Sequence, residues 1–378
     1  MEMSGFGRRP VVPTRFAEPE RVTDLFALAQ AHEGDLVPRG GGNSYGDIAI
    51  ARGGLTMGMR RLGRALEWDS SSGAIRVEAG ATMADVLSWL LPRGRSLPVV
   101  PGAPLATVGG CIAMDVHGKN AHTMGSFSDH GMSMEILSAG QLVTVTPSHG
   151  GELFRRTVGG LGVSGLIYSA TLQTVPAPSG CIRESHQVTG SLEETLEVLL
   201  AETMTSEFSY AWVDPMAGGR RRGRGIVWSA SRDLGARPPG QRPLSGPASS
   251  PGRLGLPVPR TRAWANLGLA AAITDAAWRA GSRRASQEVV VREDAFHFPF
   301  ARAPKWSNVY GRQGFLERHF VFPDAVAKEV ISRALALREE FSQPAIFASL
   351  KRFTTRSRGV LGFVRPGVSL ALQVPRSA

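Results

Sequence analysis

The chain has few cysteines and no clustered metal ligands. Only two of its 378 residues are cysteine, Cys111 and Cys181, which is too few for a disulfide framework. No Cys/His spacing typical of a zinc site occurs, so we expect no metal centre. Cys111 lies in an apolar run, where a cysteine is most simply a small buried residue. Hydrophobic residues make up 42% and charged residues 20%, which is typical of a folded globular protein.

Long apolar runs are also absent. Residues 1–9 contain no apolar segment of the kind that signal peptides carry. No stretch reaches the ~20 apolar residues that a membrane-spanning helix requires. The sequence therefore predicts a protein that is cytoplasmic or peripheral at the inner membrane, without a signal peptide or transmembrane helix.

Nucleic-acid-binding motifs are missing too, although the formal net charge is +11. No zinc-finger, RNP-like or basic-zipper pattern accompanies this charge, so we predict no nucleic-acid partner. The arginines concentrate at 220–224 and again between 237 and 284. For the first cluster we expect a solvated hairpin turn. The alternative is attraction to phosphate head groups or to an anionic substrate.

Periodicity in the N-terminal half predicts short, mixed elements. Helices are expected over 18–31 and 152–158, and another is expected after a capping box formed by Thr82 and Asp85. Strands are expected over 74–79, 97–100 and 166–175, together with a hairpin that joins 134–137 to 142–145. Strands this short and mixed favour an α+β domain over a doubly wound parallel sheet.

One dinucleotide-like motif stands in the wrong context. Gly160-Leu-Gly-Val-Ser-Gly165 matches G-x-G-x-x-G, a pattern that needs a strand before it and a helix after it. Here the expected order is the reverse, because a helix precedes the motif and a strand follows it. We therefore do not interpret it as a Rossmann-type site.

Pro176 and Pro178 mark a boundary, after which a second region begins. Residues 236–262 are rich in Pro, Gly, Ser and Arg and predict a flexible loop. The apolar segment 263–280, with Trp264 and Trp278 and flanking arginines, is either a packed helix or a helix at a membrane interface. The expected strands are 208–213, 226–229, 288–291, 317–321, 345–353 and 368–374, with a helix over 325–340.

Two glycine-rich loops carry the strongest functional signal. Residues 38–47 read PRGGGNSYGD, and residues 107–120 read TVGGCIAMDVHGKN. Glycine lets backbone N–H groups approach a phosphate closely. The second loop adds His117 and Lys119, which can carry protons or positive charge. A structural turn would explain either loop alone, but the pair predicts a clamp for a phosphate-bearing cofactor.

These motifs resemble those of FAD-dependent oxidases of the vanillyl-alcohol-oxidase superfamily, and within it the decaprenylphosphoryl-ribose 2′-oxidases. The resemblance is carried by Arg39-Gly-x-Gly-x-Ser-Tyr-Gly-Asp47 and His117-Gly-Lys-Asn120, covers nearly the whole chain and weakens after Pro178. It implies an α+β fold with a two-subdomain, PCMH-type FAD-binding domain over 1–178. A substrate domain over 179–378, built on an antiparallel sheet with flanking helices, would follow.

The cofactor that the resemblance implies is FAD. Some superfamily members tether the flavin covalently through a histidine in the first loop, where this chain has Asn43. An amide cannot form that bond, so we expect non-covalent FAD. His117 would contact the flavin and, with Lys119, is a candidate catalytic residue. A structural histidine is the alternative for His117. The expected cofactor-binding residues are Arg39, Gly40, Gly41, Gly42, Asn43, Ser44, Tyr45, Gly46, Asp47, Gly102, Thr107, Val108, Gly109, Gly110, Met114, His117 and Ile167.

The resemblance also implies a substrate pocket, in which a lysine would suit a phosphate as a point charge. Two departures concern its walls, since Glu317-Arg-His319 replaces a Gln-x-Gln pair and Ala371 replaces a cysteine beside the flavin. A third is that the family continues with a segment that returns to the FAD domain and carries a lysine near the flavin. We expect this chain to be a fragment or truncated product, or its chemistry to be altered or lost. The expected substrate residues are Tyr45, Lys119, Trp212, Glu317, His319, Lys351, Phe353 and Ser369.

The implied activity is the oxidation of a sugar secondary alcohol, C2′ of a polyprenyl-phosphoryl pentose, in arabinan and cell-wall synthesis. The alternatives are a sugar-alcohol or aldonolactone oxidase of the same superfamily, and a flavin-binding protein without turnover. The expected partners are the lipid-linked or another small sugar, a short-chain reductase acting on the keto product, and a peripheral membrane contact.

Overall fold

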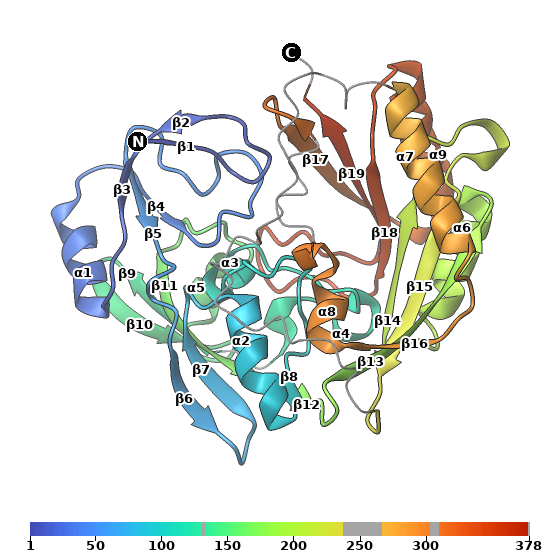
Figure 1. Cartoon of the computed structure of the whole chain (residues 1–378). Helices are drawn as coiled ribbons and strands as arrows, with labels where there is room; N and C mark the ends of the chain where they lie inside the picture. The colour runs from blue at the N-terminus through green and yellow to red at the C-terminus, as the bar shows by residue number, and fades with distance from the viewer. Residues whose placement is uncertain (131–132, 237–266, 303–309, 377–378) are drawn as a thin grey trace.

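The computed structural model describes residues 1–130, 133–236, 267–302 and 310–376. They form two lobes that lie side by side in Figure 1. The first lobe holds a three-stranded and a five-stranded sheet with short helices, and the second holds one seven-stranded sheet with packed helices. The predicted α+β class is confirmed.

A parallel three-stranded sheet leads into the first glycine loop. In spatial order its strands are β3 (Arg15–Ala17), β5 (Leu55–Gly58) and β4 (Leu36–Arg39). Helix α1 (Val22–Ala31) connects β3 to β4, in agreement with the helix predicted there. Strand β4 ends at Arg39, so the glycine loop leaves the sheet at the carboxyl end of this strand. Near the N-terminus, β1 (Glu2–Met3) pairs with β2 (Val12–Pro13).

An antiparallel five-stranded sheet forms most of the remaining first lobe. In spatial order its strands are β10 (Gln141–Val145), β9 (Ser133–Ser138), β11 (Leu166–Gln173), β7 (Ala74–Glu78) and β6 (Ala65–Asp69). The predicted hairpin is confirmed, since Ala139 and Gly140 join β9 to β10 with φ of 49° and 78°. The predicted capping box is confirmed as well, because Thr82 and Asp85 cap helix α2 (Met83–Leu90) reciprocally.

One strand prediction was wrong. Residues 97–100 form no strand, and the short strand β8 (Arg95–Ser96) lies just before them, paired with β12 (Val175–Pro176). Leu97, Val99 and Val100 are each 1% exposed. Their apolar pattern therefore reflects burial and not strand pairing, and Pro98 has no N–H to donate to a ladder.

The segment around the G-x-G-x-x-G pattern has the order that the sequence predicted. Helix α5 (Gly151–Thr157) precedes it and strand β11 follows it, the reverse of a Rossmann arrangement. Two short helices, α3 (Val108–Ala113) and α4 (Ala121–Met124), flank the His117–Asn120 part of the second glycine loop.

The second lobe is built on one antiparallel seven-stranded sheet. In spatial order its strands are β16 (Val289–Arg292), β13 (Cys181–Thr189), β15 (Gly225–Arg232), β14 (Phe208–Val213), β18 (Phe347–Phe353), β19 (Gly367–Pro375) and β17 (Phe315–Phe322). Each strand predicted for this region has its counterpart here. Helices α6 (Leu192–Glu202) and α9 (Asp324–Glu340) cover one face, over a core that includes Ile331, Leu350 and Leu370.

The opposite face of this sheet meets the first lobe and helix α7 (Leu267–Ser282). The helix predicted over 263–280 is confirmed from Leu267 onward. Residues 237–266, which include Trp264 and nearly all of the predicted loop 236–262, lie outside the described residues. A short helix, α8 (Glu293–His297), lies between the two lobes in Figure 1.

The arginine cluster at 220–224 is only partly solvated, which corrects the prediction of a solvated turn. Arg220 and Arg221 are exposed, but Arg224 is 4% exposed. Arg224 pairs with Asp214 at 2.8 Å and with Asp275 of α7 at 2.7 Å. A buried guanidinium requires such partners because its desolvation is costly.

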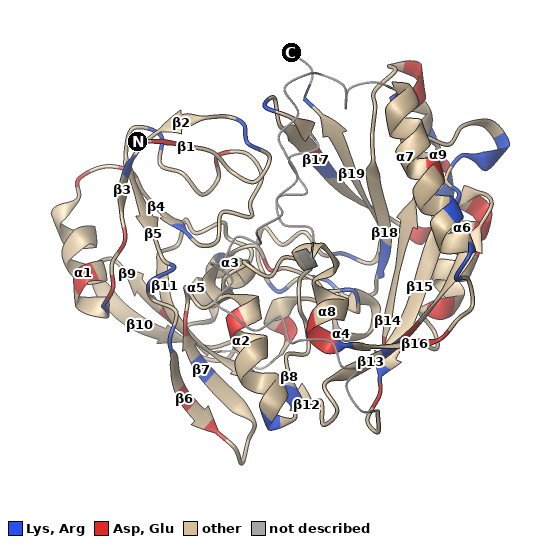
Figure 2. Cartoon of the chain, viewed as in Figure 1, with Lys and Arg blue, Asp and Glu red and all other residues tan. Residues whose placement is uncertain are grey.

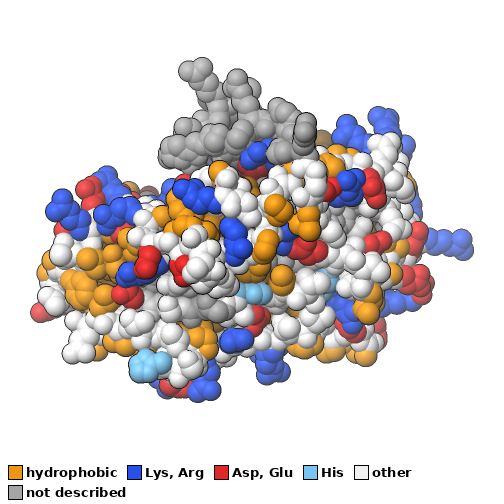
Figure 3. Space-filling model, turned by 90° about the horizontal axis from the view of Figure 1, so that it is seen from below, with side chains coloured by type: hydrophobic (Ala, Val, Ile, Leu, Met, Phe, Trp, Pro, Cys, Tyr) orange, Lys and Arg blue, Asp and Glu red, His pale blue; other side chains and the backbone are white. Residues whose placement is uncertain are grey.

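Charges of both signs are mixed on the surface. In Figure 3, basic and acidic side chains alternate over the face seen from below, so the positive excess does not gather in one patch there. None of the described helices combines the length and the apolar composition needed to cross a bilayer.

Candidate functional site

A cavity lies where three glycine-containing loops of the first lobe converge. About 610 Å³ of empty space, part of it open to solvent, lies within this hollow. A second hollow adjoins it, shares Pro38, Ile48 and Leu161 with it, and continues to the turn between β9 and β10. The loop residues that line the first part are Gly40, Ser44, Thr107, Gly109, Gly110, Leu161, Gly162 and Gly165.

Glycine is required where the first two loops touch. A Cβ on Gly40 would lie 2.2 Å from Oγ1 of Thr107, and one on Gly41 would lie 1.8 Å from the carbonyl oxygen of Leu105. Gly42 has φ of 69°, and a Cβ there would lie 2.6 Å from the Arg39 guanidinium. Side chains at these positions would separate the loops or deform the backbone.

The first loop contains buried donors without acceptors. Nη1 of Arg39 and Nδ2 of Asn43 are buried and have no hydrogen-bond partner in the described chain. Nη2 of Arg39 donates to the carbonyl of Ser4 at 2.9 Å, and burial lowers the pKa of the guanidinium. A buried donor without a partner is costly. The loop therefore suits a ligand that brings acceptor oxygens, and a diphosphate such as that of FAD fits this donor set.

The predicted cofactor residues separate into three groups. Those that line the cavity are Gly40, Ser44, Thr107, Gly109, Gly110, Met114 and Ile167. Arg39, Gly41, Gly42 and Asn43 shape the first loop behind its lining. The others lie away from the cavity: Gly46 is in an open turn, Asp47 pairs with Arg52, Gly102 is exposed, Val108 is in the core, and Tyr45 and His117 meet the second lobe.

Sequence reasoning missed the third wall of the cavity. Leu161, Gly162 and Gly165 have φ of 60°, 82° and 147°, and all three line it. They belong to the G-x-G-x-x-G segment that does not form a Rossmann site. The glycine spacing did mark a close approach of backbone to a cavity, although through a different fold.

The predicted substrate residues gather on one face of the seven-stranded sheet. Lys351 pairs with Ser369, Trp212 pairs with Ser349, and His319 pairs with Ala371. Because directly paired side chains share a face and side chains alternate along a strand, the register puts the whole set on the face toward the first lobe. This set is Trp212, Glu317, His319, Lys351, Phe353 and Ser369.

His117 touches this face rather than the cavity. Its Nδ1 lies 3.4 Å from Nζ of Lys351 and 3.3 Å from the carbonyl oxygen of Gly118. Its ring lies 4.7 Å from that of Phe353 and 5.4 Å from that of His319. Burial, and then the charge of Lys351, hold the pKa of His117 well below its usual value, so the ring is neutral. Phe353 is 1% exposed and packs as a core residue.

Lys119 is enclosed by aromatic rings. Its Nζ donates to the carbonyl of Phe296 and lies 4.1 Å from the ring centre of Phe296 and 4.6 Å from that of Tyr210. Burial lowers the pKa of Lys119 to about 7, while the carboxylate of Glu184 opposes this shift and Lys351 adds to it. A buried lysine is thus held by cation–π contacts at the junction of the lobes.

Tyr45 links the first glycine loop to the sheet. Its hydroxyl donates to Oε2 of Glu317 at 2.9 Å and accepts from Nε2 of Gln373 at 3.1 Å. Gln373 also donates to Glu317 at 2.6 Å and accepts from the hydroxyl of Tyr310 at 3.0 Å. Burial, and then Glu317, raise the pKa of Tyr45, so the phenol keeps its proton. Sequence reasoning missed Gln373, although alternation from Ser369 along a strand predicts its face.

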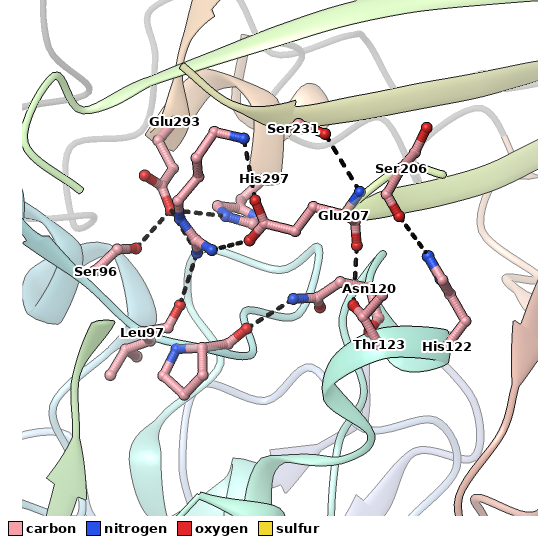
Figure 4. Close-up of polar contacts among 12 residues, drawn as sticks. Ser96, Leu97, Asn120, His122, Thr123, Ser206, Glu207, Ser231, Glu293 and His297 are labelled. Carbon is pink, nitrogen blue, oxygen red and sulfur yellow. Dashed lines mark hydrogen bonds and ion pairs between the residues drawn. The ribbon is translucent and has the colours of Figure 1, made fainter. Parts of the chain in front are cut away.

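Figure 4 shows a polar junction between the lobes. Glu293 of α8 is fully buried and accepts from Ser96 at 2.6 Å and from Nη2 of Arg232 at 3.1 Å. Arg232 also pairs with Glu207 and donates to the carbonyl of Leu97. These contacts cross from one lobe to the other, and so they hold α8 in place.

Comparisons with known proteins agree with this geometry. A family profile described as an FAD binding domain matches residues 13–146. Decaprenylphosphoryl-beta-D-ribose oxidase of Mycolicibacterium smegmatis is 31% identical over 389 residues, covering 100% of this chain and 83% of that protein. L-gulonolactone oxidase of Bos taurus is 28% identical over 53% of this chain and 46% of its own length. D-lactate dehydrogenase of Anaerostipes hadrus is 28% identical over 48% of this chain and 40% of its own length.

The cavity, its glycine walls and the matching profile define an FAD-binding oxidoreductase. The chain belongs to the family of FAD-dependent oxidases that includes decaprenylphosphoryl-beta-D-ribose oxidase. Among the described residues, no group of three or more His, Cys, Asp or Glu side chains is placed to hold a metal ion.

Proposed function

We propose that this protein oxidises a secondary alcohol of a sugar, with C2′ of a polyprenyl-phosphoryl pentose as the favoured substrate. The observation that carries the proposal is a pair of amines, the buried Lys119 and the half-buried Lys351, where the FAD half meets the seven-stranded sheet. Desolvation makes positive charge on such amines costly unless an anion accompanies it. A phosphorylated sugar supplies that anion, and the similarity over the whole chain to a decaprenylphosphoryl-ribose oxidase supports the same substrate class.

The proposed roles follow from the contacts. Lys119 uses one of its three donors on the Phe296 carbonyl and keeps two for phosphate oxygens. Glu317 and Gln373, fixed by Tyr45, offer acceptors and donors to sugar hydroxyls. Bound FAD supplies the two-electron acceptor for the hydride of the alcohol carbon. The chain's own side chains bind and orient the sugar and move the hydroxyl proton.

The cofactor is proposed to be held without a covalent bond, because Asn43 stands where a tethering histidine would be. Acid precipitation of the purified holoprotein should release yellow flavin into the supernatant. Flavin that stays with the pellet would contradict this part of the proposal.

The decisive experiment is anaerobic flavin reduction. Purified holoprotein is mixed with a polyprenyl-phosphoryl pentose, its dephosphorylated analogue or an aldonolactone, and the visible flavin absorbance is followed. We expect the phosphorylated sugar to bleach the flavin fastest. Fastest bleaching by the lactone would favour an aldonolactone oxidase. If none bleaches a flavin that dithionite still reduces, a protein without turnover is the better conclusion.

A membrane contact and a downstream reductase complete the proposal. On α7, Leu267 is 38% exposed, and Arg283 and Arg284 are exposed just after its end. Figure 2 marks acidic residues on α6, whereas the only acid on α7, Asp275, is paired with Arg224 and Arg279. An apolar helix with a basic end fits an anionic lipid surface. The keto product would then pass to a short-chain reductase.

A further inference from the structure

Lysine is rare in this chain, and two of its four lysines lie in the candidate site. Of 43 basic residues only four are lysine: Lys119, Lys305, Lys328 and Lys351. Lys328 is exposed and pairs with Glu193, and Lys305 lies outside the described residues. All other basic residues counted here are arginine. Lys119 and Lys351 therefore offer what a guanidinium cannot, because a desolvated amine can release a proton near neutral pH and arginine cannot.

Lys351 is better placed than Lys119 to accept a proton. Lys119 is bonded to the Phe296 carbonyl and covered by two rings. The only hydrogen-bonding neighbour of the Lys351 amine in the described part of the chain is Nδ1 of His117, at 3.4 Å. Lys351 also makes no ion pair there, in contrast to Lys328. Within the described residues, His117 alone lies within hydrogen-bonding distance of this amine, which leaves its remaining valences for a substrate hydroxyl.

The contact with His117 suits a neutral amine. Nδ1 of His117 also lies 3.3 Å from the Gly118 carbonyl, which can only accept. With the proton on Nδ1, the ring donates toward both neighbours, and Lys351 must then offer a lone pair. When Lys351 gains a proton, the neutral ring can accept from it as the other tautomer. The protonation state of Lys351 and the tautomer of His117 are thus coupled, and His117 orients the amine.

The charged and titratable groups around Lys351 come from both lobes. They are His117 and Lys119 from the second glycine loop and Glu317 and His319 from β17. Burial lowers the pKa of Lys351 to about 8, and the carboxylate of Glu317 opposes the shift. Burial and Lys351 lower the pKa of His319 to about 3, so this ring is neutral and does not compete for the proton. Near neutral pH, part of the population carries a neutral Lys351.

We propose that Lys351 is the catalytic residue that accepts the hydroxyl proton in the alcohol oxidation, with His117 as its positioning residue. The substrate O–H bond breaks and a new N–H bond forms on the Lys351 amine. The C–H bond at the same carbon breaks with its electron pair, which leaves as a hydride to the bound FAD, and the carbon becomes a ketone. The inference rests on the proposed alcohol oxidation and adds the identity of the base.

Replacing one cation by another separates the two roles of a lysine. Lys351→Arg keeps a positive charge but cannot accept a proton at neutral pH. We expect this variant to keep FAD and to bind the phosphorylated sugar within about threefold of wild type. Its rate of anaerobic flavin reduction should fall at least ~100-fold, as for loss of a general base. In wild type we expect this rate to rise with pH as Lys351 loses its proton, and in the variant this rise should be absent. The matched control is Lys328→Arg, the same change at an exposed position, which should leave rate and pH profile unchanged.

The outcomes separate this inference from the proposed function. If wild type oxidises the sugar and Lys351→Arg does so at the same rate and with the same pH profile, Lys351 is not the base, although the function stands. If wild type oxidises none of the sugars, or the variant does not fold, the amine is examined directly in wild type. Competitive acylation with mass spectrometry should show Lys351 titrating near its lowered pKa of about 8. Titration of Lys351 at the ordinary lysine value of about 10.4 would overturn the inference.

Discussion

The two halves of the candidate site are built in different ways. The first lobe lines the cavity largely with residues of glycine-containing loops, each of which is continuous in sequence. The seven-stranded sheet offers side chains from β14, β17, β18 and β19, which are far apart in the chain and meet only through strand register. A change in the first half therefore alters backbone shape, while a change in the second removes one charge or one hydrogen bond. Effects should be abrupt in the first half and graded in the second.

Gly42→Val should have the largest effect. Gly42 has φ of 69°, and a Cβ there would crowd the Arg39 guanidinium at 2.6 Å. A β-branched residue in this conformation costs roughly 1–3 kcal/mol. The loop would deform, and we expect the purified variant to contain no FAD, as measured by its flavin-to-protein absorbance ratio.

Gly53→Val is the matched control for that prediction. Gly53 has φ of 72° but has open space where a Cβ would be, and it lies in a turn outside the glycine loop. It should lose similar stability and keep its flavin. Normal FAD content in a folded Gly42→Val variant would remove this loop from the cofactor site.

Lys119→Ala should have a smaller, graded effect. Losing one charge contact to a phosphate should weaken binding by roughly 1.5–3 kcal/mol, which is about one to two decades in Kd. The change should affect a polyprenyl-phosphoryl pentose and spare its dephosphorylated analogue, and FAD content should not change. Calorimetric titration of both ligands measures this. An equal loss for both would mean that Lys119 serves the fold or the sugar and not the phosphate.

This contrast also explains what could be predicted from the sequence. The hairpin at Ala139–Gly140 and the Thr82–Asp85 cap are local patterns, and both predictions are confirmed. The two glycine loops are local patterns as well, and parts of both line the cavity. The strand prediction for Leu97–Val100 is wrong, because a buried segment can have the same apolar pattern as a strand. The sequence does not show whether such a segment pairs with another strand. Contacts between distant segments form the Tyr45–Glu317–Gln373 network. Such contacts also bring the two aromatic rings over Lys119. No local pattern encodes them.

Glu293→Gln tests the junction that holds the halves together. Burial alone would raise the pKa of Glu293, but His297, Arg232 and Ser96 outweigh it and hold the pKa at about 2. A carboxyl whose pKa is lowered by folding stabilises the protein above its unfolded pKa of about 4.3, and this contribution is lost as the pH falls toward the folded value.

We therefore expect the urea-unfolding free energy of wild type to fall more steeply than that of Glu293→Gln between about pH 4.5 and 2, by on the order of 2 kcal/mol. Glu152→Gln serves as the comparison, since Glu152 is exposed and its pKa is lowered by Arg155 and Arg156. Water screens that pair, so its removal should hardly change the slope. Parallel slopes for wild type and Glu293→Gln would show that the junction is not held by this charge.

The smallest expected effect concerns two helices that cover the same sheet. The exposed part of α7 is apolar with arginines at its end, whereas α9 mixes both signs, as in the ion pair of Arg333 with Glu340. Each basic residue near an anionic membrane contributes about 1 kcal/mol of attraction. Arg283→Gln should therefore weaken sedimentation with phosphatidylserine-containing vesicles about fivefold. Arg333→Gln, the same change on α9, should leave it unchanged, because the α9 surface carries acids that cancel the attraction. Equal weakening by both variants would mean that the whole basic surface attracts lipid without a preferred face. If wild type does not bind such vesicles, α7 is not a membrane contact. Its apolar surface would then favour a protein as its partner.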